Sequence, residues 1–267
     1  MLTAGDRERI QTKARAAIGK ATLRKDSWWA YPTSVGLFLT ITIAYSTWAG
    51  VFGGSGYHVA PYISPIFSPC LAVNCEEATF RLIGEWWFLS PAIIVMWLPI
   101  FFRLTCYYYR KAYYRAFFFS PPACAVAEPI PSLPTRYGET RGPFLLQNLH
   151  RYFFYLMIAN MVFLSWDTAR AFHFSDGWHL NVGSLVFLVM IATMGLYMLS
   201  CHSCRHAVGG RLVKFSEAPL RYRSWKIVTK LNKRHGQYAL ASLLWIPVTD
   251  LYVRLVANGT ITDFRIF

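Results

Sequence analysis

Residues Leu180–Leu199 read LNVGSLVFLVMIATMGLYML, and the stretch that follows, Ser200–His206, reads SCHSCRH. A run of about 20 residues without a charged side chain is long enough to cross the hydrocarbon core of a bilayer as a helix. The chain is 55% hydrophobic with a mean hydropathy of +0.30, which exceeds what a water-soluble domain of 267 residues needs for its core. The run therefore predicts a membrane protein.

Four further apolar runs come close to the same length. Together with the first, the predicted spans are Tyr31–Val51, Trp86–Leu104, Tyr152–Ala171, Leu180–Leu199 and Tyr238–Val256. The sequence thus predicts an all-α integral membrane fold, a bundle of five transmembrane helices over residues 31–256. Residues 1–30 are expected to form an amphipathic tail. Residues 257–267 are expected to form a tail on the opposite side of the membrane, because the number of spans is odd.

The Lys and Arg residues are concentrated on one side of this predicted bundle. Of the 27 in the chain, seven fall in the N-terminal tail, seven from Arg103 to Arg151 around the loop after the second run, and nine between the fourth and fifth runs. Positive charge of this kind collects in cytoplasmic loops, so the N-terminus and the basic loops are predicted to face the cytoplasm at the plasma membrane. The net charge of +14 then reflects topology, because the basic segments flank spans and do not form a nucleic-acid-binding stripe.

Two charged pairs lie near the ends of predicted spans, on the side opposite the basic loops. Asp167 and Arg170 are three residues apart, and Asp250 and Arg254 are four apart. Charged groups near a membrane boundary can reach water and can pair at low cost, so both pairs are predicted to have a structural role.

The six cysteines fall into two groups. Cys70 and Cys75 lie in the loop opposite the basic face, where a structural disulfide between them stays open. The other thiols fall at the basic face together with four imidazoles, and these candidate ligands are Cys106, Cys124, His150, Cys201, His202, Cys204, His206 and His235. Thiols and imidazoles at a bilayer boundary are poor lipid-facing groups and good ligands for a redox metal.

Helix geometry limits how the SCHSCRH stretch can bind a metal. If the helix of the fourth span continued, Cys201 and Cys204 would share one face and His202 and His206 another, about 150° away at 100° per residue. One helix therefore cannot give all four side chains to one centre. Neighbouring helices must contribute ligands.

Two thiolates with two imidazoles are the donor set of a Rieske-type [2Fe–2S] cluster. The predicted metal ligands are Cys201, Cys204, His150 and His235. The alternates are His202 or His206 for nitrogen and Cys106 or Cys124 for sulfur. Zinc would accept the same ligands, but a zinc site cannot relay electrons.

Several longer stretches resemble a known family. They are Asp26–Pro32 (DSWWAYP), Thr105–Arg115 (TCYYYRKAYYR), Ser120–Pro129 (SPPACAVAEP) and Gln147–Tyr155 (QNLHRYFFY). These motifs resemble the cytochrome b-like membrane-anchor subunit of actinobacterial succinate dehydrogenases, or respiratory complex II. The resemblance implies an anchor that docks a flavoprotein and an iron–sulfur subunit on the cytoplasmic face and passes electrons to quinone. The succinate site would then lie on another chain.

Electrons arriving from the cytoplasm need an acceptor near that face. Trp28 and Tyr31 can enclose a quinone ring there, Ser27 can donate a hydrogen bond to a quinone carbonyl, and Arg24 can counter negative charge on the reduced ring. These four residues are the predicted quinone site. An interfacial aromatic belt explains the same Trp and Tyr residues and stays open as the alternative.

Two other functions stay open. Anchors of the wider succinate dehydrogenase class often carry haem b between histidines, and His150 could hold a haem with another basic-face histidine. The pair Cys201 and Cys204 could instead be the dithiol of a membrane thiol:quinone oxidoreductase, provided that it faced an oxidising compartment. A transporter is disfavoured because the five unequal runs show no repeat.

Overall fold

The computed structural model describes residues 27–53, 55–69, 92–118, 144–210 and 212–267, together with residue 5. Four residues singled out above lie outside these described residues: Arg24 of the predicted quinone site, the alternate ligand Cys124, and Cys70 and Cys75. Most of the predicted tail 1–30 also lies outside them.

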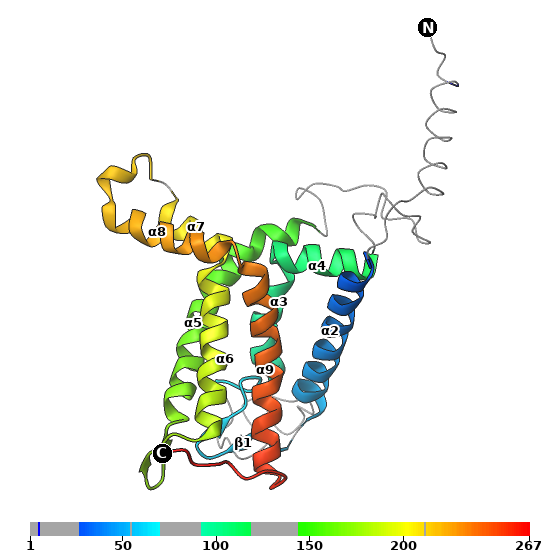
Figure 1. The fold of residues 1–267 in the computed structure, drawn as a ribbon, viewed down its shortest axis with the longest axis vertical. Helices are drawn as coiled ribbons and strands as arrows, with labels where there is room; N and C mark the ends of the chain where they lie inside the picture. The colour runs from blue at the N-terminus through cyan, green and yellow to red at the C-terminus, as the bar shows by residue number, and fades with distance from the viewer. Residues whose placement is uncertain (1–4, 6–26, 54, 70–91, 119–143, 211) are drawn as a thin grey trace.

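Among the described residues, five helices run side by side (Figure 1). They are α2 (Ala30–Thr47), α3 (Ala92–Leu104), α5 (His150–Arg170), α6 (Val182–Leu199) and α9 (His235–Ala257), and α2 continues into the short π-helix η1 (Trp48–Phe52). Three helical stretches in the described chain are long and apolar enough to cross a membrane: Ala30–Phe52, Val182–Leu199 and His235–Ala257. An all-α membrane protein is thereby confirmed. That α3 and α5 also cross the membrane stays a prediction.

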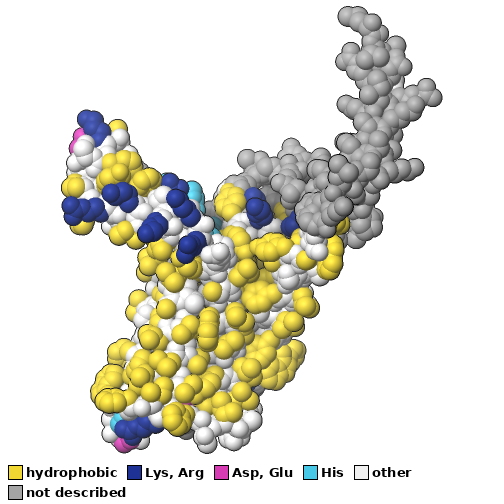
Figure 2. Space-filling view, in the orientation of Figure 1, with side chains coloured by type: hydrophobic (Ala, Val, Ile, Leu, Met, Phe, Trp, Pro, Cys, Tyr) yellow, Lys and Arg dark blue, Asp and Glu magenta, His cyan; other side chains and the backbone are white. Residues whose placement is uncertain are grey.

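The short helices gather at one end of the bundle, which we call the basic end. They are α4 (Tyr107–Phe118), α7 (His202–Gly209), α8 (Pro219–Asn232), and the 3-10 helices η3 (Phe144–Leu149) and η4 (Phe215–Glu217). Figure 1 shows α4 lying across this end, and α7 and α8 projecting sideways from it. Lys and Arg side chains cover the projecting arm, whereas the flank of the bundle is largely hydrophobic (Figure 2).

Two small hairpins close the opposite end of the bundle, which we call the hairpin end. Their strands are β1 (His58–Val59) with β2 (Tyr62–Ile63), and β3 (His173–Phe174) with β4 (Gly177–Trp178). Both pairs are antiparallel, with His58 opposite Ile63 and His173 opposite Trp178.

The C-terminal tail is fastened to the hairpin end through Asp263. The carboxylate accepts hydrogen bonds from the hydroxyls of Tyr62 and Tyr252, both at 2.6 Å, and from Asn181 Nδ2 at 2.8 Å. The backbone N–H of Ile266 also donates to the Leu180 carbonyl at 2.8 Å. The tail is therefore held against α6, α9 and the first hairpin.

Asp250 and Arg254 form a buried ion pair at the hairpin end. Arg254 Nε donates to Asp250 Oδ2 at 2.8 Å, and the same carboxylate accepts hydrogen bonds from the hydroxyls of Tyr45 and Ser64. The remaining N–H groups of Arg254 donate to the carbonyls of Ala49, Gly53 and Ser55. This network ties α9 to α2 and to the first hairpin loop, which agrees with the structural role predicted for the pair.

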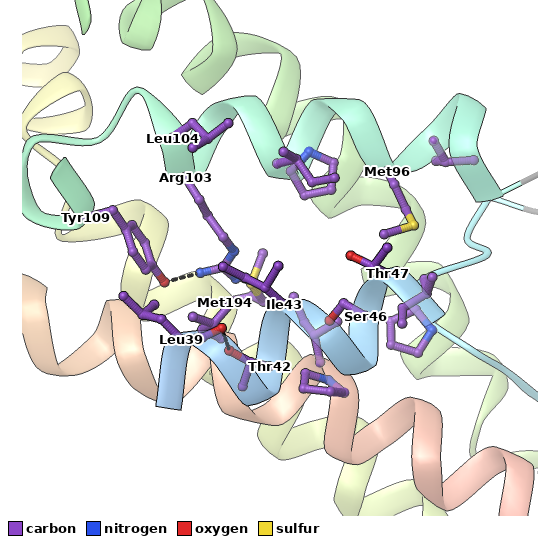
Figure 3. A pocket seen from close by; sticks show the side chains of 18 of the residues that line it. Leu39, Thr42, Ile43, Ser46, Thr47, Met96, Arg103, Leu104, Tyr109 and Met194 are labelled. Atoms are coloured by element: carbon purple, nitrogen blue, oxygen red, sulfur yellow. Dashed lines mark hydrogen bonds between the residues drawn. The ribbon is translucent and has the colours of Figure 1, made fainter. Parts of the chain in front are cut away.

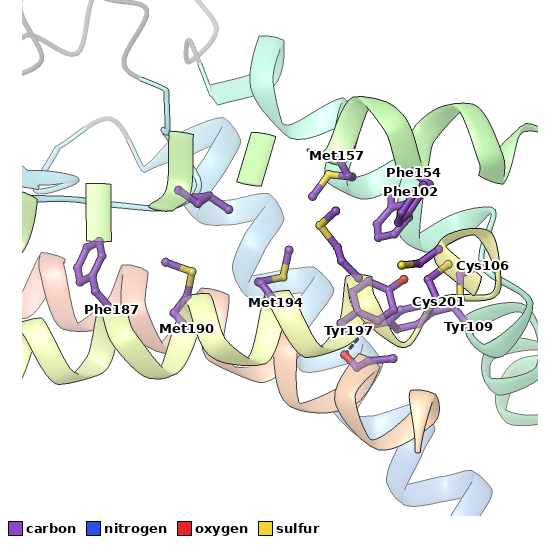
Figure 4. Packing of buried hydrophobic residues seen from close by; sticks show 14 of the residues in the cluster. Phe102, Cys106, Tyr109, Phe154, Met157, Phe187, Met190, Met194, Tyr197 and Cys201 are labelled. Atoms are coloured by element: carbon purple, nitrogen blue, oxygen red, sulfur yellow. Dashed lines mark hydrogen bonds between the residues drawn. The ribbon is translucent and has the colours of Figure 1, made fainter. Parts of the chain in front are cut away.

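The core of the bundle lies along one face of α6. Phe187, Met190, Met194 and Tyr197 recur every three or four residues and are almost completely buried (Figure 4). The helix packs against α5 and α9. At its start the Ser184 hydroxyl accepts a hydrogen bond from the backbone N–H of the N-cap residue Asn181 at 3.3 Å. The helix that leads into SCHSCRH is therefore fixed at its start and packed along its length.

Candidate functional site

Four thiol and imidazole side chains meet at the basic end. His150 Nε2 lies 3.1 Å from Cys201 Sγ, and His235 Nε2 lies 3.4 Å from Cys106 Sγ. His150 starts α5, His235 starts α9, Cys106 lies between α3 and α4, and Cys201 lies between α6 and α7. Figure 4 shows the two cysteines together beside Tyr197. We call these four residues the thiol–imidazole cluster.

Two hydroxyl groups hold the imidazole rings in a crosswise pattern. Thr105 Oγ1 lies 3.0 Å from His150 Nδ1, and Ser200 Oγ lies 2.8 Å from His235 Nδ1. Each hydroxyl residue directly precedes a cluster cysteine, but that cysteine contacts the other imidazole. In each Thr-Cys or Ser-Cys dipeptide, the hydroxyl therefore contacts Nδ1 of one imidazole ring and the cysteine sulfur contacts Nε2 of the other ring. Such partners fix the orientation and tautomer of a ligand histidine, and here they turn both Nε2 atoms toward sulfur.

Three of the four cluster residues are shielded from water, and His235 is half-buried. Cys106, Cys201 and His150 are 2%, 1% and 6% exposed. Phe102 stacks on His150 and Tyr197 stacks on His235, with ring centroids 4.9 and 5.2 Å apart. Burial raises the pKa of the Cys106 thiol and raises the pKa of the Cys201 thiol to about 12. Both thiols therefore keep their protons at neutral pH unless a metal ion displaces them.

A turn in the chain explains the position of Cys204. α6 ends at Leu199, and Cys201 is the N-cap of α7, with an extended backbone and a sulfur that accepts a hydrogen bond from Ser203 N. The helix does not continue through Cys201, so the face that it was expected to share with Cys204 is not formed. Cys204 is buried one turn further on, in α7, outside both thiol–imidazole contacts.

The structure thus brings together Cys201, His150 and His235 of the predicted ligand set. The alternate ligand Cys106 takes the position that was expected for Cys204. The other alternates, His202 and His206, are exposed on α7. Within the part of the chain that the structure describes, no three His, Cys, Asp or Glu side chains are arranged to hold a metal ion, and the cluster consists of two thiol–imidazole pairs.

Arg103 lies next to the cluster in the last turn of α3. Its guanidinium carbon is 5.0 Å from the ring centroid of Tyr197, which in turn stacks on His235. The guanidinium donates hydrogen bonds to the hydroxyls of Tyr109 and Ser242. None of these partners is a carboxylate, so they do not neutralise the positive charge of Arg103. That charge can attract an electron-rich oxygen atom.

A cavity of about 490 Å³ opens beside Arg103, between α2, α3, α4 and α9 (Figure 3). Its lining is mainly apolar. The polar side chains that reach it are Arg103, Tyr109, Tyr113, Thr42, Asn160, Ser46, Thr47 and Ser68. Four apolar residues of the lining are also exposed on the flank of the bundle: Ile43, Ile100, Leu104 and Phe117. The size, the apolar lining and the few polar groups are typical of a binding site for a small lipophilic molecule.

The described residues of the predicted quinone site lie at the start of α2. Ser27 is exposed, Tyr31 is 67% exposed, and Trp28 is half-buried with the Arg115 guanidinium 6.0 Å from its ring. None of the three lines the cavity described above.

Tyr31 nevertheless has a connection to the thiol–imidazole cluster. Its side chain lies near the side chain of Tyr108 of α4. The Tyr108 ring lies edge-on to His235, with centroids 6.4 Å apart. The start of α2 therefore reaches the cluster through a single intervening residue.

Sequence reasoning missed the residues that support the cluster. Thr105 and Ser200 directly precede the two cluster cysteines, and Arg103 precedes Cys106 by three residues, so adjacency was an available signal. Adjacency alone does not show which hydroxyl contacts which imidazole, because the crosswise contacts depend on how four helix ends meet.

Comparison with known proteins shows which family the chain belongs to. Residues 30–259 match the family model of the actinobacterial succinate dehydrogenase subunit SdhC. The chain belongs to this family. It is similar to a chain of the Mycobacterium smegmatis Sdh1 complex in the apo form, with 43% sequence identity, a TM-score of 0.80, and coverage of 92% of this chain and 94% of that chain. No curated protein sequence matches it.

The resemblance read from the sequence motifs is therefore confirmed. As an SdhC-family protein, the chain is the membrane subunit of a succinate dehydrogenase complex, and its partners are the flavoprotein and iron–sulfur subunits and quinone.

Proposed function

We propose that this SdhC chain relays electrons from the iron–sulfur subunit to quinone through a redox metal centre held by Cys106, Cys201, His150 and His235. The main support is the crosswise arrangement, in which both imidazoles present Nε2 to a buried cysteine sulfur. Two thiolates and two imidazoles match the donor set of a Rieske-type [2Fe–2S] cluster, which supplies one-electron transfer when it is bound. Succinate itself would be oxidised on the flavoprotein subunit.

The chain's own residues would serve this centre in three ways. The hydroxyls of Thr105 and Ser200 fix the imidazole orientation. The rings of Phe102 and Tyr197 cover the imidazoles and exclude water. The stack from His235 through Tyr197 to Arg103 gives packed contact from the cluster to the cavity.

The alternatives from the sequence fit the geometry less well. A haem between His150 and His235 would have to displace Phe102 and Tyr197, which stack on those rings, and would leave the two thiols without a role. Zinc would accept all four donors but would not transfer electrons. A dithiol of Cys201 and Cys204 would need the two sulfurs close together, whereas the Cys201 sulfur faces His150.

We propose the cavity as the quinone-binding site. Its volume of about 490 Å³ suits a quinone ring, and its exposed rim would face the lipid from which a quinone enters. Arg103 and Tyr109 lie at the end nearest the cluster, where a guanidinium can stabilise negative charge developing on a quinone oxygen.

The start of α2 is the second candidate for the quinone site. Ser27, Trp28 and Tyr31, with Arg24 before them, were predicted there. The position of Tyr31 near Tyr108 favours this site because Tyr108 adjoins His235.

Two matched substitutions distinguish the candidates. Ile43→Trp fills the cavity mouth, and Tyr31→Ala removes the ring at the start of α2. If quinone binds in the cavity, Ile43→Trp should lower succinate:quinone activity by about tenfold or more, because about 1.4 kcal/mol of lost binding is a factor of ten. Tyr31→Ala should leave that activity largely unchanged.

Leu188→Trp, at an exposed position of α6, is the control for adding a large ring to the flank. Reduction of a soluble dye by the flavoprotein checks that the complex stays assembled. The opposite pattern, activity lost in Tyr31→Ala and kept in Ile43→Trp, would move the quinone site to the start of α2.

The positive-inside rule further favours a cytoplasmic basic end, where the soluble subunits would dock. The arm formed by α7 and α8 carries much of the positive charge there (Figure 2).

A further inference from the structure

The cavity has a second polar end, away from the thiol–imidazole cluster. Ser68, in the loop that follows the first hairpin, lines the cavity and is 2% exposed. Its hydroxyl donates a hydrogen bond to Asp167 Oδ2. Asp167 lies in the last turn of α5 at the hairpin end, three residues before the exposed Arg170. A carboxylate near the surface is therefore joined to the cavity through one hydroxyl.

Asp167 differs from Asp250, the fully buried carboxylate at this end. Asp250 is fully buried, is paired with Arg254, and accepts hydrogen bonds from Tyr45 and Ser64, so its charge is compensated and its oxygens are occupied. Asp167 is only half-buried, and the hydrogen bond that the structure gives it comes from Ser68. Among the described residues Asp167 has no ion-pair contact, although the Arg170 charge lies nearby, so of the two it is the one that can gain and lose a proton without breaking such a contact.

Ser68 and Arg103 line the same cavity. Met96 and Arg103 both line it and are seven residues apart on α3, which corresponds to about 10 Å along the helix. Polar side chains also line the cavity, among them Thr42, Asn160 and Ser46. A quinone held beside Arg103 would thus share one cavity with Ser68.

We propose that Asp167 and Ser68 conduct protons between the quinone cavity and the aqueous phase at the hairpin end. This inference rests on the proposed quinone site. Reduction of a quinone to a quinol takes up two electrons and two protons. The electrons come from succinate through the partner subunits, so the protons remain to be supplied.

The hydrogen bond defines how each proton would move. Protonated Asp167 gives its proton to Ser68 Oγ, breaking the carboxyl O–H bond, while the Ser68 O–H proton passes toward the quinone oxygen. The ionised carboxylate is then the acceptor seen in the structure, and it is reloaded from water at the hairpin end. A carboxyl group with one hydroxyl partner can perform both halves of this exchange.

This route makes quinone reduction move charge across the membrane. Electrons would enter the cavity from the basic end, and protons would enter from the hairpin end. Succinate oxidation releases its protons on the side of the soluble subunits. Each turnover would therefore remove protons from the hairpin side and release protons on the other side.

Proteoliposomes that contain the whole complex and enclose a pH-sensitive dye test the inference. Succinate added outside reaches only complexes whose soluble subunits face outward, and a short-tailed ubiquinone analogue serves as acceptor. The wild-type complex, with valinomycin and potassium present, should make the lumen alkaline as the quinone is reduced. Asp167→Asn should abolish this change and slow quinone reduction by about 100-fold, a usual effect of losing a proton-transferring side chain.

Two variants serve as controls. Asp167→Glu keeps a carboxyl group and should retain most of the activity, and Asp176→Asn alters an exposed carboxylate of the same end and should behave as wild type. Unchanged dye reduction by the flavoprotein shows that the complex is intact.

Wild-type turnover without a change in lumen pH, or wild-type rates in Asp167→Asn, would overturn the inference. If Ile43→Trp leaves quinone reduction unaffected, it is the proposed quinone site that fails. If Ile43→Trp blocks reduction while Asp167→Asn has no effect, only the proton route fails.

Discussion

At the scale of single residues, the hydroxyls of Thr105 and Ser200 determine which nitrogen of each imidazole faces sulfur. A histidine whose Nδ1 is held by a hydroxyl has one orientation available, and its Nε2 is then directed by the backbone that carries it. Because the two hydroxyls adjoin the two cysteines in sequence, a change at any one of these positions affects both halves of the cluster.

Thr105→Val tests this dependence, because it removes the hydroxyl and keeps the shape of the side chain. We expect the metal content of the purified complex to fall, since loss of a partner of a ligand histidine costs about 10- to 100-fold in metal affinity. Metal analysis of the complex measures the effect. Thr193→Val is the control, because the Thr193 hydroxyl bonds only to carbonyls of its own helix in the structure. Equal metal content in the two variants would remove Thr105 from the site.

Asp263 gives a pH-dependent contact in the C-terminal tail. Burial alone would raise its pKa, but hydrogen bonds from Tyr252, Tyr62 and Asn181 hold the pKa below its usual value. A carboxyl group with a lowered folded pKa contributes stability that is present above its unfolded pKa of about 3.9 and is lost as the pH falls through the folded value.

The protection of the tail against hydrogen exchange, corrected for intrinsic rates, should therefore decrease as the pH falls below about 4. Asp263→Asn should weaken the protection at neutral pH and remove this pH dependence. A tail whose protection in the wild type is the same on both sides of that pH would contradict the assignment.

At the scale of elements, α4 and α9 meet where Gly236 faces the ring of Tyr108. A Cβ at Gly236 would lie 2.9 Å from Tyr108 Cδ2 and closer still to Cε2, so it would push the two helices apart beside His235. Gly195 of α6 has no atom within 4 Å of the same position.

Gly236→Ala should therefore destabilise the protein by about 1–3 kcal/mol through overpacking, whereas Gly195→Ala should be neutral or slightly stabilising. Thermal unfolding of the complex in detergent compares the two variants. If Gly236→Ala unfolds at the wild-type temperature, the close approach of α4 and α9 is not as described.

How far the sequence predicts the elements depends on their periodicity and their ends. The apolar runs located α2, α6 and α9, because length and hydropathy alone specify such helices. The runs gave less accurate starts for α5 and α9, which begin at His150 and His235 and not at Tyr152 and Tyr238. A hydropathy profile misses the first turn of a helix when the residues of that turn are polar.

The same limit explains the position of Cys204. Whether a helix continues past Leu199 depends on local capping and on packing against α7 and α8, which the spacing of cysteines does not reveal. Three of the predicted ligands, His150, Cys201 and His235, lie together at one end, where each adjoins the end of an apolar run. The fourth neighbour, Cys106, required knowing that α3 ends next to α9.

At the scale of the whole molecule, the two ends of the bundle differ in charge and in structure (Figure 1, Figure 2). The basic end carries the cluster and the projecting arm, and the hairpin end carries the buried Asp250–Arg254 pair and the fastened tail. Five spans with a cytoplasmic basic end would leave the C-terminus outside the cytoplasm.

Fusion reporters measure this topology. Alkaline phosphatase fused to the C-terminus should be active and green fluorescent protein fused there should be dark, with the reverse for fusions to the N-terminus. Reporters that agree at both ends would mean an even number of spans.

Cys106, Cys201, His150 and His235 are the residues that we propose to hold a redox metal centre. The most direct test is the electron paramagnetic resonance spectrum of the dithionite-reduced complex, compared for wild type, Cys106→Ser and Cys204→Ser. We expect the wild type and Cys204→Ser to share a rhombic signal of a Rieske-type cluster, and Cys106→Ser to lose it while the signals of the iron–sulfur subunit remain. A signal that survives in Cys106→Ser and disappears in Cys204→Ser, or no such signal in the wild type, would contradict this account.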